Sequence, residues 1–238
     1  YIWQATEASA TSSVLRRFWS TVPAVFKAQF YLCRYLLARW SLRKLDDPNW
    51  SSGKNTVFLL SYFDNFDNDF RKSGGFRSKY WEQLPGQLQS QGFRLNWAHL
   101  FVTSTIVPDT QTARHLIGQL NTNSSQNGIH ALLDQYLDWL MIVRVILDWL
   151  RSNLIYLRFL RKGSYYQKKY DWGWIWPIFQ NDLKDSFVGS VAIQNIFFNH
   201  LFDKMLGSMP RQTVGLYLME NQGWERIFLH FWRKHGHG

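Results

Sequence analysis

Two short apolar runs separated by a helix-length segment constrain the fold of this chain most. Residues 56–62 form a nearly continuous apolar run, which is typical of a strand buried on both faces of a parallel sheet. A polar segment, a predicted helix at 80–91 and a second predicted strand at 93–102 follow. This β-loop-α-β order favours parallel strands joined by a right-handed crossover. We therefore expect an α/β fold, with a Rossmann-like parallel sheet flanked by helices.

The end of the chain shows the same order of strand and helix. Residues 214–219 form a short apolar run that predicts another strand. Apolar residues at helical spacing begin directly after it, at Trp224, Ile227, Phe228, Phe231 and Trp232. Further helical patterns cover 12–45, 132–161 and 185–206, and 172–177 is expected to be a compact aromatic loop.

The N-terminal part differs in character from the rest. Basic residues dominate the polar positions of the predicted helix at 12–45, and 46–54 is a linker rich in turn formers. We expect residues 1–50 to be a basic amphipathic helix with its linker, and 51–238 to be the Rossmann-like domain. Two interpretations of the helix stand open. A scaffold helix with a solvated cationic face is favoured over an interfacial helix on anionic lipid.

The composition narrows the class of protein. The 27 Lys and Arg residues exceed the 17 Asp and Glu residues, and the formal net charge of +10 predicts attraction to nucleic acid, acidic membrane surfaces or phosphorylated substrates. The one cysteine, Cys33, excludes a disulfide framework and fits a reducing compartment. No apolar segment reaches the roughly 20 residues of a membrane span without interruption by charged or polar residues.

Polar side chains gather where two of the predicted strands end. The first group is Ser61, Asp64, Asn65 and Asp67, and the second is Glu220, Asn221, Gln222, Trp224 and Glu225. Ligands of open α/β sheets bind beyond the carboxyl ends of the strands, and parallel strands end on the same edge. The two groups together predict a site for a polyhydroxylated ligand.

Three carboxylates are candidates for a catalytic base: Glu220, Asp64 and Asp67. A carboxylate beside a nucleophilic hydroxyl suits glycosyl transfer, because the acceptor must lose a proton as the new bond forms. The substrate-binding candidates are Ser61, Asn65, Asn221, Gln222, Trp224 and Glu225. Structural alternatives stay open, since the aspartates could cap a helix or solvate a loop. Glu225 could be a first-turn acid that the helix dipole stabilises.

Other kinds of site find little support in the sequence. The histidines show no spacing for zinc, so we expect no metal site. Neither a Walker-type phosphate loop nor a dinucleotide fingerprint is present, so we expect no bound cofactor. His99 lies inside a predicted strand and is expected to be a core histidine.

Several motifs resemble a known family. The specific one is Tyr-Leu-Met-Glu-Asn-Gln-Gly-Trp-Glu at 217–225, followed by Phe-Trp-Arg-Lys-His-Gly-His-Gly at 231–238. Weaker ones are Ser-Tyr-Phe-Asp at 61–64 with Tyr-Trp-Glu-Gln-Leu-Pro at 80–85, and Ser-Phe-Val-Gly at 186–189 before Met-Pro at 209–210. Together they resemble bacterial surface-carbohydrate biosynthesis proteins, which build O-antigen or capsule and look like two-domain, GT-B-type glycosyltransferases.

The resemblance implies that this chain is the N-terminal, acceptor-side half of a GT-B architecture, without the C-terminal donor domain. It implies transfer of a sugar from a nucleotide-sugar, bound as a substrate and not as a cofactor, to a glycan or lipid-linked acceptor. It also implies a cytoplasmic location with peripheral contact at an anionic inner membrane. Basic residues of the N-terminal helix and at 158–169 would hold the membrane or a phosphorylated lipid carrier.

A function from another class stays open as the alternative. The chain could be a non-catalytic binding module, either a membrane-associated scaffold or a nucleic-acid binder. Positive charge with many aromatic residues suits single-stranded nucleic acid. The basic residues are nevertheless dispersed over amphipathic helices, and no recognised RNA- or DNA-binding motif occurs. Nucleic acid is therefore the less favoured partner.

Overall fold

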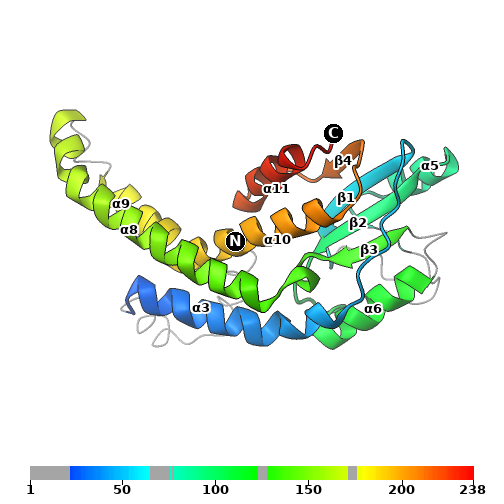
Figure 1. Ribbon diagram of the computed structural model, residues 1–238, viewed down its shortest axis with the longest axis horizontal. Coiled ribbons are helices and arrows are strands. Elements are labelled where there is room, and N and C mark those ends of the chain that lie inside the picture. The colour runs from blue at the N-terminus through cyan, green and yellow to red at the C-terminus, as the bar shows by residue number, and fades with distance from the viewer. Residues whose placement is uncertain (1–21, 65–75, 77, 123–127, 171–175) are drawn as a thin grey trace. The chain divides into compact units, whose positions relative to one another are not determined.

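The chain folds into two compact units. The computed structural model describes residues 22–64, 76, 78–122, 128–170 and 176–238 (Figure 1). The described residues of 1–34 and 147–194 form one unit, and those of 35–146 and 195–238 form the other, which contains the sheet. These units do not test the boundary expected at residue 50, which stays a prediction.

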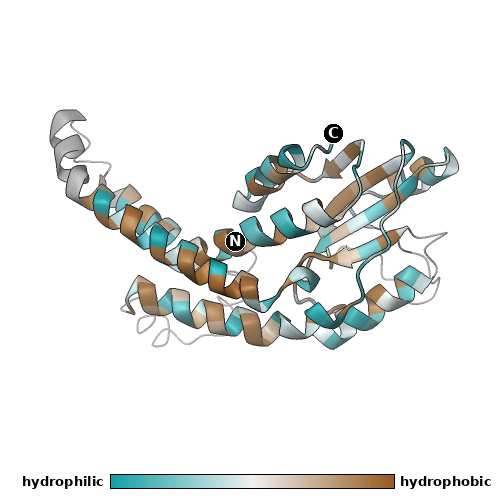
Figure 2. Ribbon diagram, viewed as in Figure 1, coloured by the Kyte–Doolittle hydropathy of each residue, from teal (hydrophilic) through white to brown (hydrophobic). Residues whose placement is uncertain are grey.

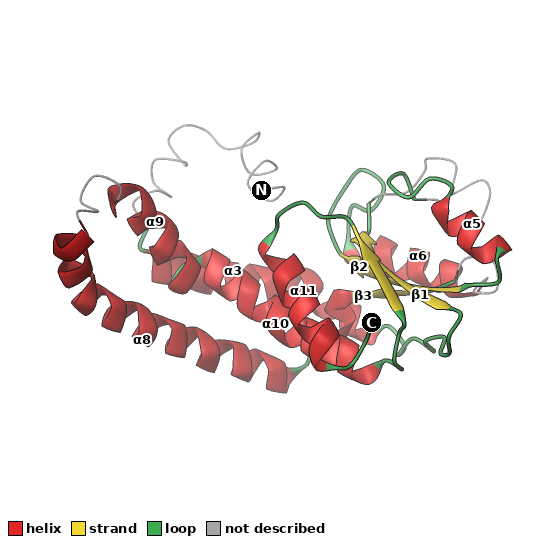
Figure 3. Ribbon diagram, turned by 90° about the horizontal axis from the view of Figure 1, so that it is seen from above, coloured by secondary structure: helices red, strands yellow, loops and turns green. Residues whose placement is uncertain are grey.

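A four-stranded parallel sheet forms the centre of the second unit. Its strands are β1 (Thr56–Tyr62), β2 (Arg94–Leu100), β3 (Ile129–Leu132) and β4 (Val214–Tyr217). Their order across the sheet is β3-β2-β1-β4, and every pair is parallel (Figure 1). Figure 3 shows the strands in yellow and the helices in red. The predicted α/β class and the parallel sheet flanked by helices are confirmed, and the topology is consistent with a Rossmann-like fold.

The helices account for most of the remaining described residues. They are α3 (Ala24–Arg39), α5 (Leu84–Ser90), α6 (Thr110–Thr122), α8 (Trp139–Tyr170), α9 (Trp176–Phe187), α10 (Ser190–Ser208) and α11 (Gly223–Lys234), with short 3-10 turns η1 (Trp40–Lys44) and η2 (Leu133–Tyr136). In the part of the chain that the structure describes, none of them is long and apolar enough to cross a membrane.

Side chains of β1 alternate between two apolar layers. Val57 and Leu59 pack with Trp97 of β2 in one buried cluster. Phe58 points to the other face, where its ring centroid lies 5.9 Å from that of Phe228 and 5.4 Å from that of Trp232, both on α11. Since both faces of β1 are covered, its sequence has to be apolar almost throughout, as the run at 56–62 indicated.

Several expected boundaries were wrong. The helix expected from 132 begins at Trp139, because Ile129–Leu132 is a strand and η2 follows it. The single helix expected at 185–206 is two, α9 and α10, and α9 begins at Trp176 inside the expected aromatic loop. The N-terminal helix is described from Ala24, directly after Pro23, and its expected part at 12–21 lies outside the described residues.

Gly128 occupies a position that only glycine fits. Its φ of +84° lies in the left-handed region, and an added Cβ would meet the backbone oxygen of Leu95 at 2.5 Å. Gly92 has the same φ of +84°, but a Cβ there would meet nothing within 4 Å. We expect Gly92→Ala to destabilise the protein by about 1–2 kcal/mol, from left-handed strain alone.

Gly128→Ala should cost more than Gly92→Ala, since the start of β3 must also move away from β2. We expect a total of about 2–3 kcal/mol, measured by urea unfolding of both variants. Equal losses in the two variants would show that the contact with Leu95 relaxes without cost.

Candidate functional site

The ends of β1 and β4 lie side by side. The two strands are parallel neighbours, with Leu60 of β1 paired with Tyr217 of β4. Asp64 follows the end of β1 by two residues, and Glu220 follows the end of β4 by three. Both acids therefore lie at the same edge of the sheet, as the sequence predicted. Of the remaining candidates after β1, Asn65 and Asp67 lie outside the described residues.

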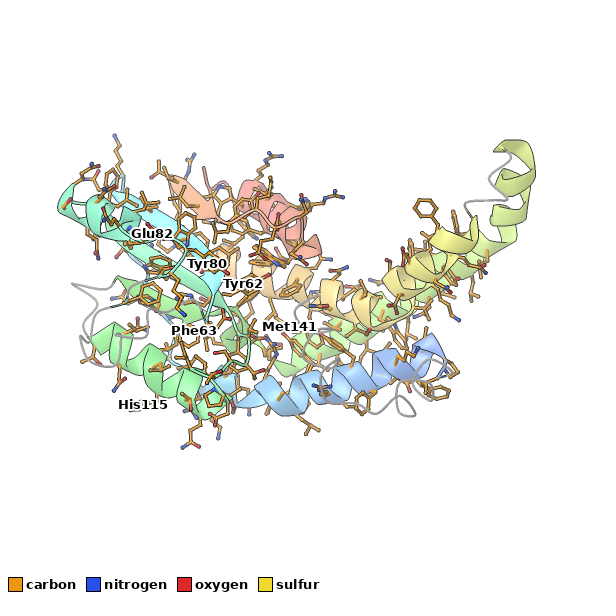
Figure 4. All side chains as sticks on the ribbon, turned by 180° about the vertical axis from the view of Figure 1, so that it is seen from behind. Tyr62, Phe63, Tyr80, Glu82, His115 and Met141 are labelled. Atoms are coloured by element: carbon orange, nitrogen blue, oxygen red, sulfur yellow. The ribbon has the colours of Figure 1, made fainter. Side chains whose placement is uncertain are left out.

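Tyr62, which is labelled in Figure 4, is the last residue of β1 and contacts residues that follow β4. The indole Nε1 of Trp224 donates a hydrogen bond of 3.1 Å to the Tyr62 hydroxyl, and the two rings meet edge to face. Burial raises the pKa of Tyr62 to about 12, and the charge and hydrogen bonding of Glu220 add to the shift. The phenol thus stays protonated at neutral pH and can donate to a carboxylate or to a ligand oxygen.

Glu225 organises the turn that presents Glu220. One of its carboxylate oxygens, Oε1, accepts hydrogen bonds from the backbone N–H of Glu220 at 2.7 Å and of Gln222 at 2.9 Å. Asn221 lies between them at φ +58°, a left-handed conformation that asparagine tolerates. Glu225 is buried, as a first-turn acid that satisfies free N–H groups would be. Its predicted contact with a substrate stays a prediction.

Asp64 has the electrostatic character expected of a proton acceptor. The side chain is half-buried, and this burial raises the pKa of its carboxyl. A hydrogen bond from its own backbone and the positive charge of Lys79 oppose the shift in part. A carboxylate whose pKa is raised binds a proton more tightly, which brings it closer to the operating range of a general base.

The other predicted binding residues differ in accessibility. Ser61 is buried, and its hydroxyl donates a weak, 3.4 Å hydrogen bond to the backbone oxygen of Tyr62. Asn221 is exposed, and Gln222 is half-buried at the N-cap of α11. Trp224 is buried, with its ring also edge to face with Tyr217. The exposed polar groups of this edge thus come mainly from the turn after β4.

Two contributors to the site were not found from the sequence. The sequence pattern indicates Tyr62 only as the last residue of a buried apolar strand. Its hydroxyl was the signal that a polar partner lies at the strand end. Lys79 lies between Asp64 and α5 in the chain, and nothing in the pattern linked it to Asp64. His99, by contrast, was correctly predicted as a core residue. It is fully buried, with its Nε2 2.9 Å from Nδ1 of His130.

A second polar feature lies on α11 but faces away from the sheet. A shallow hollow there is lined by Arg226, Leu229, His230, Arg233 and Lys234. These residues alternate along the helix with the buried Phe228, Phe231 and Trp232. The hollow is therefore separate from the strand ends, and it contains none of the predicted site residues.

Comparisons with known proteins give no further guide to this site. No family model, no curated protein and no solved structure matches the chain. Among the described residues, no three His, Cys, Asp or Glu side chains are grouped closely enough to hold a metal ion.

Proposed function

We propose that this chain is the acceptor-side domain of a GT-B-type glycosyltransferase in bacterial surface-polysaccharide biosynthesis. The reaction transfers a sugar from a nucleotide-sugar to a glycan or lipid-linked acceptor. The observation that supports this most is the shared sheet edge, to which β1 and β4 bring Asp64, Tyr62 and Glu220. The motif at 217–225, which resembles the family signature, forms the β4 side of that edge.

The residues divide the work of such a transfer. Asp64 takes the proton of the acceptor hydroxyl while the acceptor oxygen bonds to the anomeric carbon of the donor. The bond from that carbon to the phosphate oxygen breaks, and its electron pair leaves with the nucleoside diphosphate. Glu220 and the neutral phenol of Tyr62 hold acceptor hydroxyls in place through hydrogen bonds. Trp224 supplies a rigid aromatic wall beside them.

A turnover assay on the full-length protein tests this function. Incubation with a panel of nucleotide-sugars should release nucleoside diphosphate only when a glycan or lipid-linked acceptor is present, and the labelled sugar should appear in the acceptor. A protein that turns over no donor, yet binds oligonucleotides at nanomolar concentration with steep salt dependence, would instead be the binding module.

A further inference from the structure

Helix α8 exposes an apolar stripe along the part of it that belongs to the first unit. Leu147, Leu150, Leu154 and Leu157, here called the leucine stripe, follow each other at spacings of three and four residues. Their side chains are 48%, 48%, 55% and 53% exposed. In Figure 2 the coloured part of α8 is largely brown, which marks hydrophobic residues. Exposed apolar surface of this extent marks an interaction site more often than a solvated face.

The leucine stripe is not the side of α8 that packs against the rest of the unit. Trp149 and Tyr156 lie on that other side and are buried. The Trp149 indole donates a 2.9 Å hydrogen bond to the backbone oxygen of Val188, and the Tyr156 ring lies 6.2 Å from that of Phe187. The helix therefore has one apolar face in contact with the protein and a second one that faces solvent.

Positive charge accompanies the stripe along one edge. Arg151 and Arg158 each follow a stripe leucine directly and are seven residues apart, so they project in a row beside it. Both are exposed, and the contact of Arg151 with Asp148 is itself an exposed pair that leaves most of its charge available. Over its whole sequence, α8 contains seven Arg and Lys residues and one acid.

A second copy of the chain would not satisfy these charges. In a parallel pair of α8 helices, Arg151 and Arg158 would face the partner positions of Ile146 and Asn153. In an antiparallel pair, arginines would face arginines. Neither arrangement supplies a carboxylate, whereas a surface of anionic lipid headgroups offers negative charge beside an apolar layer.

We propose that the leucine stripe and its arginines dock this protein on an anionic membrane surface. The leucines enter the boundary between headgroups and acyl chains, and Arg151 and Arg158 bind lipid phosphates and carboxylates beside them. This assigns membrane contact to α8 and not to the N-terminal helix at 12–45. The inference goes beyond the proposed sugar transfer and does not depend on it.

Flotation of the full-length protein with lipid vesicles tests the proposal. Wild-type protein should float with vesicles of phosphatidylcholine and phosphatidylserine, less so at high salt, and only weakly with phosphatidylcholine alone. The pair of changes Leu150→Glu and Leu154→Glu should abolish flotation, and both positions are exposed, so the melting temperature should not change. Arg151→Ala with Arg158→Ala should weaken binding to the anionic vesicles about 30-fold, at about 1 kcal/mol per arginine.

Matched variants separate the surface from general charge effects. Arg226→Ala with Arg233→Ala removes the same charge from α11 and should leave vesicle binding unchanged. Phe26→Glu with Leu37→Glu adds the same negative charge as the two leucine-stripe changes, but at exposed positions of α3 that are 59% and 86% accessible. This variant should also leave vesicle binding unchanged. Loss of binding in this α3 variant, with the stripe variant binding normally, would overturn the proposal.

Two further outcomes would also overturn it. One is flotation that is equal on neutral and anionic vesicles and unaffected by the stripe changes. The other is a dimer in analytical ultracentrifugation that Leu150→Glu with Leu154→Glu dissociates, without any binding to vesicles, because the occupant would then be a second copy. None of these readouts involves turnover, so failure here leaves the proposed sugar transfer untouched.

Discussion

Asp64→Asn in the full-length protein is expected to slow sugar transfer about 10²–10⁴-fold, the usual contribution of a general base. The amide keeps the size and polarity of the side chain but cannot accept the acceptor's proton. The same change should raise stability at neutral pH, by less than about 1 kcal/mol because the carboxyl is partly solvated. The stabilisation follows from burial, which raises the pKa of Asp64 and so makes its charged form costly to fold. Initial rates and thermal unfolding of the same preparations measure both effects.

The rate of sugar transfer and the contribution of Asp64 to stability should change with pH in opposite directions. Transfer should rise with pH as Asp64 loses its proton, with a midpoint above the ordinary aspartate value. The folded state binds this proton more tightly than the unfolded state, so acidification through the raised pKa favours folding at this group. Asp64→Asn should remove that contribution, and the stability of the variant should gain less than that of the wild type as the pH falls.

An acid elsewhere on the molecule provides the matched control. Asp109 is exposed and accepts a hydrogen bond from the backbone N–H of Thr112 at 2.7 Å, at the start of α6. Asp109→Asn should leave both transfer and its pH profile unchanged. Glu220→Gln should reduce transfer less than Asp64→Asn, because the amide still bonds to hydroxyls. Wild-type rates in Asp64→Asn would show that this carboxylate is not the base.

The strands β1 and β4 could be predicted because each is an apolar run next to turn formers, and β2 because it follows a helical pattern in a longer strand-like segment, 93–102. β3 could not, since it has only four residues and continues directly into the apolar Leu133, so the segment from 132 resembled the start of a helix. A histidine becomes acceptable inside a strand once a partner satisfies it. Here the partner is His99, whose Nε2 lies 2.9 Å from His130 Nδ1 across the neighbouring strand. A pattern of single residues along the chain does not contain that pairing.

In the candidate site, too, features set by the order of strands could be predicted, whereas contacts between residues far apart in the sequence could not. The shared edge of Asp64 and Glu220 could be predicted, because it needs only that β1 and β4 are parallel and adjacent. The hydrogen bond from Trp224 to Tyr62 joins residues 162 positions apart and depends on how α11 packs against the sheet. Glu225 was expected either as a ligand or as a first-turn acid. Its two hydrogen bonds from backbone N–H groups support the first-turn role, and they are visible only in the folded structure.

Asp134→Ala is expected to destabilise the sheet-containing unit by about 3–5 kcal/mol, because it breaks a buried ion pair by removing the carboxylate that binds the Arg39 guanidinium. Both side chains are nearly inaccessible, with 7% of Arg39 and 2% of Asp134 exposed. One guanidinium nitrogen lies 2.7 Å from Asp134 Oδ2, and another donates to the backbone oxygen of Phe101 at 3.0 Å. The Tyr35 hydroxyl donates to the second carboxylate oxygen. Urea unfolding of the variant and the wild type measures the loss.

Two comparisons show whether the loss in unfolding free energy comes from breaking a buried ion pair. Replacing both partners, as in Arg39→Met with Asp134→Leu, should cost much less than Asp134→Ala, since neither charge of the pair then has to be buried. Lys234→Ala breaks the exposed pair of Lys234 with Asp203, whose atoms lie 2.8 Å apart, and should cost less than about 1 kcal/mol. If Asp134→Ala cost no more than Lys234→Ala, water would have to reach Arg39 in the variant. The network that ties α3 to η2 would then be a solvated contact and not part of the core.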